Sequence, residues 1–168
     1  MIRFFVLLAF MVFAISCDRT NQAVETTKQS GPGEGGYTPA KLLLFGAPWC
    51  GECKKELPEV NQLLKEHSAA FREALTIQVL VTTGAERTDM PTQEIADELI
   101  QSLGLAGMEA LPDPKWEVFK KYLGRRLVGR LPAAVIIPLG PDGGEPILLK
   151  PGTYVAQDVL LTLKEVMQ

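Results

Sequence analysis

Hydrophobic and polar positions follow two patterns along residues 41–168. Short, unbroken apolar runs are typical of buried strands, and apolar positions three or four residues apart are typical of one helical face. The first pattern predicts strands at 41–45, 75–83, 133–138 and 146–150. The second predicts helices at about 51–67, 91–104, 114–124 and 156–167. Strand–helix–strand–helix units followed by a hairpin and a helix predict an α/β sandwich with a mixed sheet.

The first 39 residues show a different pattern. Arg3 precedes an apolar run over 4–15 that is too short to span a bilayer, as in a secretory signal peptide. The small residues before Cys17 resemble the lipobox of bacterial lipoproteins, so residues 1–16 are expected to be a lipoprotein-type signal peptide and Cys17 the lipid attachment site. A plain signal peptide with an incidental cysteine is the alternative. The polar residues 17–39 predict a flexible tether to a domain over 40–168.

Composition narrows the possible partners and the domain count. The 168 residues suffice for one well-packed domain, and 46% of them are hydrophobic. The formal net charge is -3, with neither a basic cluster typical of nucleic-acid binding nor an acidic tail. Binding to DNA or RNA is therefore not expected.

Three cysteines occur in the chain, and two of them are Cys50 and Cys53. An exported protein meets an oxidising compartment, where cysteines normally pair. If Cys17 carries a lipid, Cys50 and Cys53 have only each other, and the loop that they close is too small to gain much chain entropy. Reactivity explains this pair better than stability does.

The predicted elements place Cys50 where a strand ends and a helix begins. Free N–H groups and the positive end of the helix dipole stabilise a thiolate there, which lowers a cysteine pKa from about 8.5 towards 7. Cys53 returns to the same side of the helix three residues later, where it can attack a mixed disulfide and release the product. Cys50 is thus the expected nucleophile and Cys53 the resolving thiol.

The segment WCGECKKELP, residues 49–58, resembles the active-site segment of thioredoxin-fold proteins, specifically of the TlpA/ResA-like extracytoplasmic branch. The matching residues are Trp49, Cys50, Cys53, Lys54 and Pro58, and Glu56 matches a glutamate of the ResA-like members. Two later segments, 111–124 and 129–138, resemble the family's Asp-Pro segment and its strand entry with a cis-proline. The resemblance covers residues 40–168 and implies a thioredoxin-like three-layer α/β/α sandwich with a mixed central sheet.

The same resemblance implies roles for further residues. Pro132 is expected to be the cis-proline, which would bring the Leu131 backbone beside the disulfide to pair with an extended substrate. Trp49 is expected to shape this substrate-binding site. Glu56 is expected to transfer a proton to or from the buried Cys53 thiol. No cofactor is expected other than the redox-active disulfide itself.

Two positions depart from the family pattern. Gly51-Glu52 replaces the common Gly-Pro or Glu-Pro between the cysteines, and a carboxylate so near Cys50 opposes its thiolate. We therefore expect a more reducing pair. Leu44 stands where cytosolic thioredoxins carry a buried acidic residue, which leaves Glu56 as the nearest replacement.

These features indicate a membrane-tethered extracytoplasmic thiol–disulfide oxidoreductase that reduces protein disulfides, on the periplasmic side of the inner membrane. Electrons would come from a membrane donor of the DsbD/CcdA type, and cytochrome c maturation or related redox homeostasis would be its role. An oxidant, or a thioredoxin-like carrier that binds copper(I) through two thiolates, is the alternative. Structural zinc is not expected, because it needs four ligands and only the distant His67 adds to the two cysteines.

Overall fold

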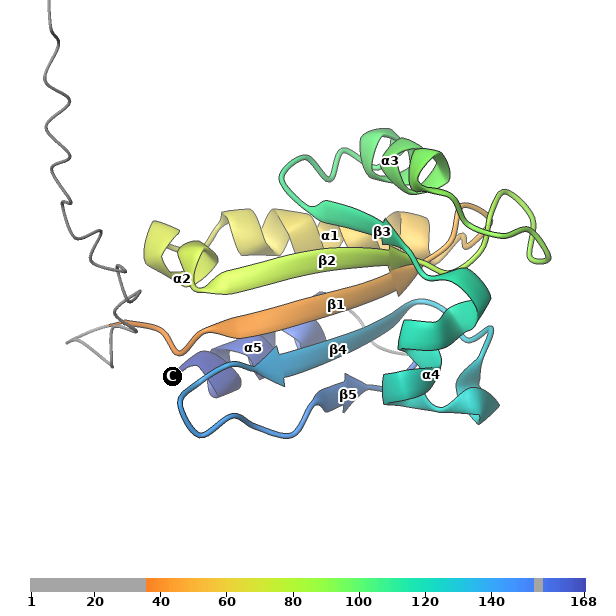
Figure 1. The fold of residues 1–168 in the computed structure, drawn as a ribbon. Helices are drawn as coiled ribbons and strands as arrows, with labels where there is room; N and C mark the ends of the chain where they lie inside the picture. Colours follow the sequence, from red (N-terminus) through yellow and green to blue (C-terminus); the bar gives the residue numbers. More distant parts are fainter. Residues whose placement is uncertain (1–35, 153–155) are drawn as a thin grey trace, which may run out of the picture. The chain divides into compact units, whose positions relative to one another are not determined.

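The computed structural model describes residues 36–152 and 156–168. Their strands form one five-stranded sheet in the order β3-β2-β1-β4-β5 (Figure 1). The strands are β1 (Ala40–Gly46), β2 (Leu75–Val81), β3 (Glu109–Pro112), β4 (Ala133–Pro138) and β5 (Ile147–Leu149). The first three are parallel, β4 runs antiparallel to β1, and β5 runs antiparallel to β4. The sheet is therefore mixed, as the sequence predicts.

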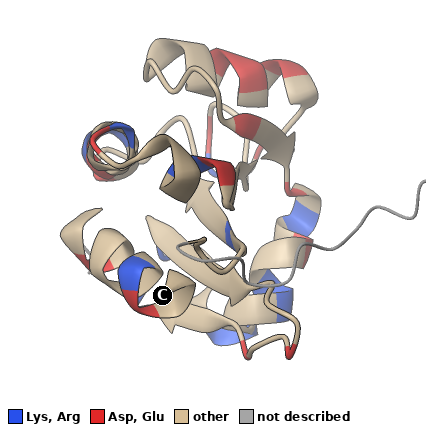
Figure 2. Ribbon diagram, turned by 90° about the vertical axis from the view of Figure 1, so that its left-hand side faces the viewer, with Lys and Arg blue, Asp and Glu red and all other residues tan. Residues whose placement is uncertain are grey.

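Helices cover both faces of this sheet. They are α1 (Cys53–Lys65), α2 (Ala69–Glu73), α3 (Gln93–Ser102), α4 (Glu117–Leu123) and α5 (Ala156–Met167), with short 3₁₀ helices η1 (Pro114–Trp116) and η2 (Arg125–Leu127). Helices α1 and α5 pack on one face, where α3 also covers the β3 edge, and α4 packs on the other (Figures 1 and 2). The three-layer α/β/α sandwich is confirmed.

The central strand β1 is buried on both faces. Leu42 and Leu44 point to the layer of α1 and α5, and Leu43 and Phe45 point to α4, because successive strand side chains alternate. The Phe45 ring meets Phe119 edge to face, with centroids 5.3 Å apart. This double burial explains why the strand reads as an unbroken apolar run.

Besides the short η2, the structure adds two elements that the sequence patterns did not predict. Strand β3 has four residues at the sheet edge and buries only Ala110, and α2 has five residues and buries only Phe71. One buried side chain sets no periodicity. Both elements are therefore visible only in the folded chain.

The expectation of one helix over 114–124 was wrong at its start. Lys115 and Trp116 adopt positive φ angles of 58° and 61°, so the α-helix begins only at residue 117. The fully buried Asp113 carboxylate accepts hydrogen bonds from the backbone N–H groups of Val118, at 2.8 Å, and Phe119, at 2.9 Å. Asp113 thus satisfies the free N–H groups of this delayed helix start.

The residues just before β1 already make contacts with the rest of the domain. Thr38 donates a backbone hydrogen bond to Met167, Pro39 accepts one from Leu139, and the Tyr37 ring packs against Phe71 with centroids 5.1 Å apart. Residues 37–39 of the predicted tether therefore contact the domain. The predicted signal peptide and Cys17 lie outside the described residues. Within the described ranges, no helix is long and apolar enough to cross a membrane.

Candidate active site

Cys50 and Cys53 form a disulfide in the turn that joins β1 to α1. The turn is closed by a hydrogen bond of 3.0 Å from the Cys50 backbone N–H to the Ala47 carbonyl. The Cys53 backbone N–H, at the first residue of α1, lies 3.1 Å from the Cys50 Sγ and donates to it. This donor and the positive end of the helix dipole both favour negative charge on the Cys50 sulfur once the disulfide opens.

The two cysteines differ in their access to solvent. Cys50 is 5% exposed and Cys53 is fully buried. A Cβ placed on Gly46 would come within 3.2 Å of Leu57 Cδ1 and 3.9 Å of Cys53 Sγ. The inner sulfur therefore lies against the last residue of β1, and a partner molecule can approach only Cys50.

Trp49 is held beside the disulfide by two contacts from the loop after β2. Its indole N–H donates to the hydroxyl of Thr83 at 2.7 Å, and Thr83 is 3% exposed. The guanidinium of Arg87 stacks over the ring, 4.4 Å from its centroid. This arrangement fixes one wall of the site without any contribution from α1.

The Leu131–Pro132 peptide bond is cis, as the resemblance implies. The antiparallel pairing of Phe45 with Ala133 places Pro132 level with Gly46, next to the disulfide turn. Leu131 packs against the clusters on both faces of the sheet, and its backbone makes no hydrogen bond to another described residue. The Pro132 carbonyl accepts a bond of 2.7 Å from Gly152.

Glu56 connects the active-site helix to α5. Its Oε2 accepts a hydrogen bond of 2.9 Å from the backbone N–H of Ala156, the first residue of α5. A second polar contact joins the Gln157 amide to Glu59 at 2.7 Å. Glu56 is half-buried and lies three residues after Cys53 on the same helix. The carboxylate therefore has a structural contact in addition to its expected role in proton transfer.

The charge of Glu52 is balanced locally. Lys55 Nζ lies 2.9 Å from Glu52 Oε1, and both side chains are exposed. The hydrogen bond and the charge of Glu52 raise the pKa of Lys55 above its ordinary value. Because Lys55 holds this carboxylate, its opposition to a Cys50 thiolate is weaker than the sequence alone suggests.

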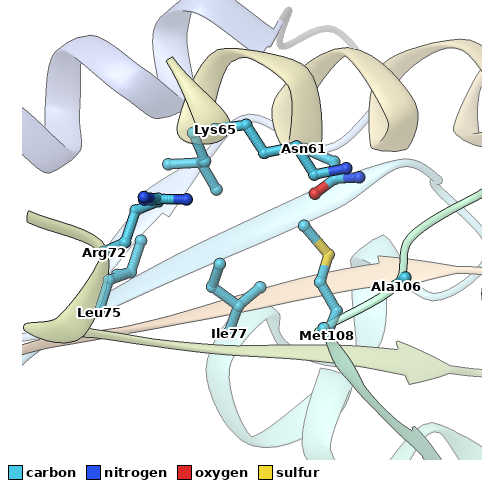
Figure 3. Close-up of a pocket in the computed structure, with 9 residues that line it drawn as sticks. Asn61, Lys65, Arg72, Leu75, Ile77, Ala106 and Met108 are labelled. Carbon is cyan, nitrogen blue, oxygen red and sulfur yellow. The ribbon is translucent and has the colours of Figure 1, made fainter. Parts of the chain in front are cut away.

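Other candidate groups lie away from the disulfide. His67, beyond the end of α1, packs against Phe71 with ring centroids 4.7 Å apart. A cavity of about 230 Å³ opens near it, with Lys65 and Arg72 above Leu75, Ile77 and Met108 (Figure 3). Lys65 is twelve residues after Cys53, roughly 18 Å along the helix. In the part of the chain that the structure describes, no three His, Cys, Asp or Glu side chains gather to hold a metal ion.

Thr83 and Arg87 belong to the site but were not predicted as site residues. Parallel strands β1 and β2 end at the same edge of the sheet, so the loop after β2 meets the turn after β1. That rule could have pointed to residues 82–91 as a whole. No pattern in the sequence marks Thr83 or Arg87 individually.

Comparison with known proteins identifies the fold. No family model matches the chain. DsbF from Mycobacterium tuberculosis superposes with a TM-score of 0.57 at 18% identity, over 77% of this chain and 81% of that one. The exposed lipoprotein thioredoxin of Streptococcus pneumoniae gives 0.54 at 20% identity, over 76% and 85%. The fold is thioredoxin-like.

One curated protein matches part of the chain in sequence. A probable protein disulfide-isomerase ER-60 of Schistosoma mansoni is 34% identical over 74 residues, which is 44% of this chain. The match spans only 15% of that protein's length.

Proposed function

We propose that this protein is a thiol–disulfide oxidoreductase that works through Cys50 and Cys53. The observation that carries the proposal is a disulfide at the N-terminus of α1 in which Cys50 keeps 5% of its surface exposed and Cys53 is fully buried. Attack from outside then has one direction, and the second thiol is within reach for resolution. The thioredoxin-like fold and the named relative support the same chemistry.

The reaction begins from the reduced pair. The Cys50 thiolate attacks a substrate disulfide, forms a mixed disulfide and displaces one substrate thiolate, which takes up a proton. Cys53 then loses its proton and attacks the Cys50 sulfur. The Cys50–Cys53 disulfide forms, the second substrate thiol leaves, and two electrons have passed to the substrate. A second dithiol must reduce the pair before the next cycle.

Neighbouring residues have defined parts in this proposal. Trp49 is fixed from the Thr83 side, and Leu131 presents a backbone with no hydrogen bond to a described residue, so an extended substrate can pair between them. Glu56 is three residues from Cys53 and takes the proton that Cys53 releases. The displaced substrate thiol leaves on the side of Cys50, which keeps 5% of its surface exposed, and not on the side of the fully buried Cys53.

The finer assignment rests on the sequence. We propose a TlpA/ResA-like reductant, tethered through Cys17 to the periplasmic side of the inner membrane and supplied with electrons by a DsbD/CcdA-type donor. The motif at 49–58, with Glu56 in it, supports the subfamily, and the lipobox-like residues before Cys17 support the anchor. The carboxylate of Glu52, two residues after Cys50, supports the reducing direction, with an effect that its ion pair with Lys55 reduces.

Two variants, each made in a chain that also carries Cys17→Ser, test the activity. Cys53→Ser should attack a protein disulfide and accumulate as a mixed disulfide, because the resolving thiol is missing. Cys50→Ser should form none, because Cys53 is buried. The adducts are counted by mass spectrometry after acid quenching and are released by dithiothreitol. Equal adduct yields from both variants, or none from either, would overturn the proposal.

A further inference from the structure

We propose that arginines at the active-site end of the sheet select substrates whose cysteines are flanked by acidic residues. The arginine rim consists of Arg87, Arg125, Arg126 and Arg130. This inference rests on the proposed function, because it names the class of disulfide that the Cys50–Cys53 pair reduces.

The sheet topology brings these arginines to the disulfide. Cys50 follows the end of β1, and Arg87 follows the end of β2, which is parallel to β1. Strand β4 is antiparallel to β1, so the segment 124–131 that precedes it reaches the same end of the sheet (Figure 1). Arg130 lies two residues before Pro132.

Three of the four rim arginines lie in residues 124–131, which carry no acidic residue, on a chain whose net charge is -3; Arg87 has Glu86 beside it and Asp89 two residues later. Four of the five arginines among residues 36–152 and 156–168 belong to the rim. The segment 115–130 carries six cationic residues and a single acidic one, Glu117. In contrast, α3 carries three acidic residues and no cation, and its acidic colour is visible along the top helix of Figure 2.

The rim arginines are available for a partner. All four are exposed, and none lies within ion-pair distance of a carboxylate in the described part of the chain. The Arg87 guanidinium lies over the Trp49 ring, 4.4 Å from its centroid, and it has five N–H donors to offer a carboxylate. The loop that carries Arg87 is closed by a bond of 3.0 Å from the Glu86 backbone N–H to the Asp89 carboxylate.

Arginine recognises carboxylates through two parallel N–H···O bonds, a geometry that lysine cannot reproduce. Arg87 is on the Trp49 side of the disulfide, and Arg130 leads into the Leu131 backbone on the other side. An extended substrate strand seated beside Leu131 would therefore present residues on both sides of its cysteine to the rim. The acidic α3 repels such a strand and directs it away from the β3 edge.

The test uses two peptides with the same disulfide, flanked by glutamates in one and by lysines in the other. The reduced full-length protein should reduce the glutamate peptide about tenfold faster at low salt. The preference should collapse near 1 M salt, where the screening length is about 3 Å. The variant Arg125→Gln/Arg126→Gln/Arg130→Gln should lose it.

A matched control removes three cations at the far end of the domain. Lys65→Gln/Arg72→Gln/Lys164→Gln makes the same change in net charge and should keep the preference. The neutral 2-hydroxyethyl disulfide should be reduced equally by all three proteins. A preference that persists in the rim variant, or is lost equally in the control, overturns the proposal.

Binding separates the rim from the redox chemistry. A glutamate peptide with serines in place of its cysteines should bind the wild type and should bind the rim variant about tenfold more weakly. Weaker binding by the rim variant supports the role of the arginine rim in binding acidic peptides. If the wild type binds the peptide but reduces no disulfide, only the proposed function fails. If the rim variant binds this peptide normally but no longer binds vesicles of anionic lipid, the rim faces a membrane and the proposal is wrong.

Discussion

Glu56 allows its structural contact and its proposed proton transfer to be measured separately. Glu56→Ala removes the acceptor of the Ala156 backbone N–H, a group that is 1% exposed and lies at the start of α5. Glu56→Gln keeps an oxygen that can accept this bond but cannot hold a proton at neutral pH. Only Glu56→Ala therefore loses the hydrogen bond to Ala156, whereas both variants lose the carboxylate that would accept a proton.

The structure sets the size of the stability effect. A hydrogen bond to a charged group contributes about 1.5–3 kcal/mol, and a negative charge at a helix N-terminus about 0.3–1 kcal/mol. Glu56→Ala should lower the free energy of unfolding by about 2 kcal/mol, and Glu56→Gln by less than about 1 kcal/mol. Urea unfolding of the oxidised proteins measures both values.

The kinetic effect should be the same in the two variants. Without a carboxylate to accept the Cys53 proton, both variants should release substrate from the mixed disulfide about a hundredfold more slowly. Rapid acid quenching of the preformed mixed disulfide, over a range of pH, measures this step. If Glu56→Gln resolves at the wild-type rate with an unchanged pH profile, Glu56 serves only to join α1 to α5. If Glu56→Ala unfolds at the wild-type urea concentration, the contact with Ala156 contributes nothing.

Three other changes have defined outcomes. Asp113→Ala should lower the free energy of unfolding in urea by about 2–4 kcal/mol, because the part-buried N–H of Val118 and the buried N–H of Phe119 lose their acceptor. Asp113→Asn should recover about half of this loss. Equal stability of Asp113→Ala and the wild type would contradict the capping role. Gly46→Val should lower the free energy of unfolding by about 2 kcal/mol in the same assay, because even a Cβ at residue 46 would lie 3.2 Å from Leu57. An unchanged urea midpoint would show that β1 and α1 can move apart at this position. Lys55→Gln should make the reduction potential of the Cys50–Cys53 pair more negative by about 10 mV. The reason is that the Glu52 carboxylate, without its ion pair to Lys55, opposes the Cys50 thiolate more strongly. A shift of the potential to a less negative value would contradict this reasoning.

Much of the fold follows from local patterns. The apolar runs that became β1, β2 and β4 are buried on one or both faces of the sheet, and this burial is what makes such runs readable. The edge strand β3 leaves no such trace because it buries one side chain. The break before α4 depends on Asp113, whose carboxylate reaches past two residues with positive φ to cap a helix that starts later.

Some features of the site could likewise be predicted from local sequence, and others depend on contacts between distant residues. The spacing of Cys50 and Cys53 and the motif around Pro132 are local, and the disulfide and the cis peptide bond lie where they were predicted. The contacts of Trp49 with Thr83 and Arg87 join residues more than thirty positions apart, so they arise only when β1 and β2 pair. The contact of Glu56 with Ala156 spans a hundred positions and depends on the packing of α1 against α5.

The reduction potential of the Cys50–Cys53 pair tests the central claim most directly. The full-length protein is equilibrated in dithiothreitol or glutathione buffers of known ratio, and the reduced fraction is counted by thiol alkylation and mass spectrometry. If the protein is a reductant, the pair should have a potential of about -250 mV or below. A value near -120 mV, roughly that of a strong oxidant, would contradict the reducing direction, and a pair that does not cycle at all would contradict the redox function.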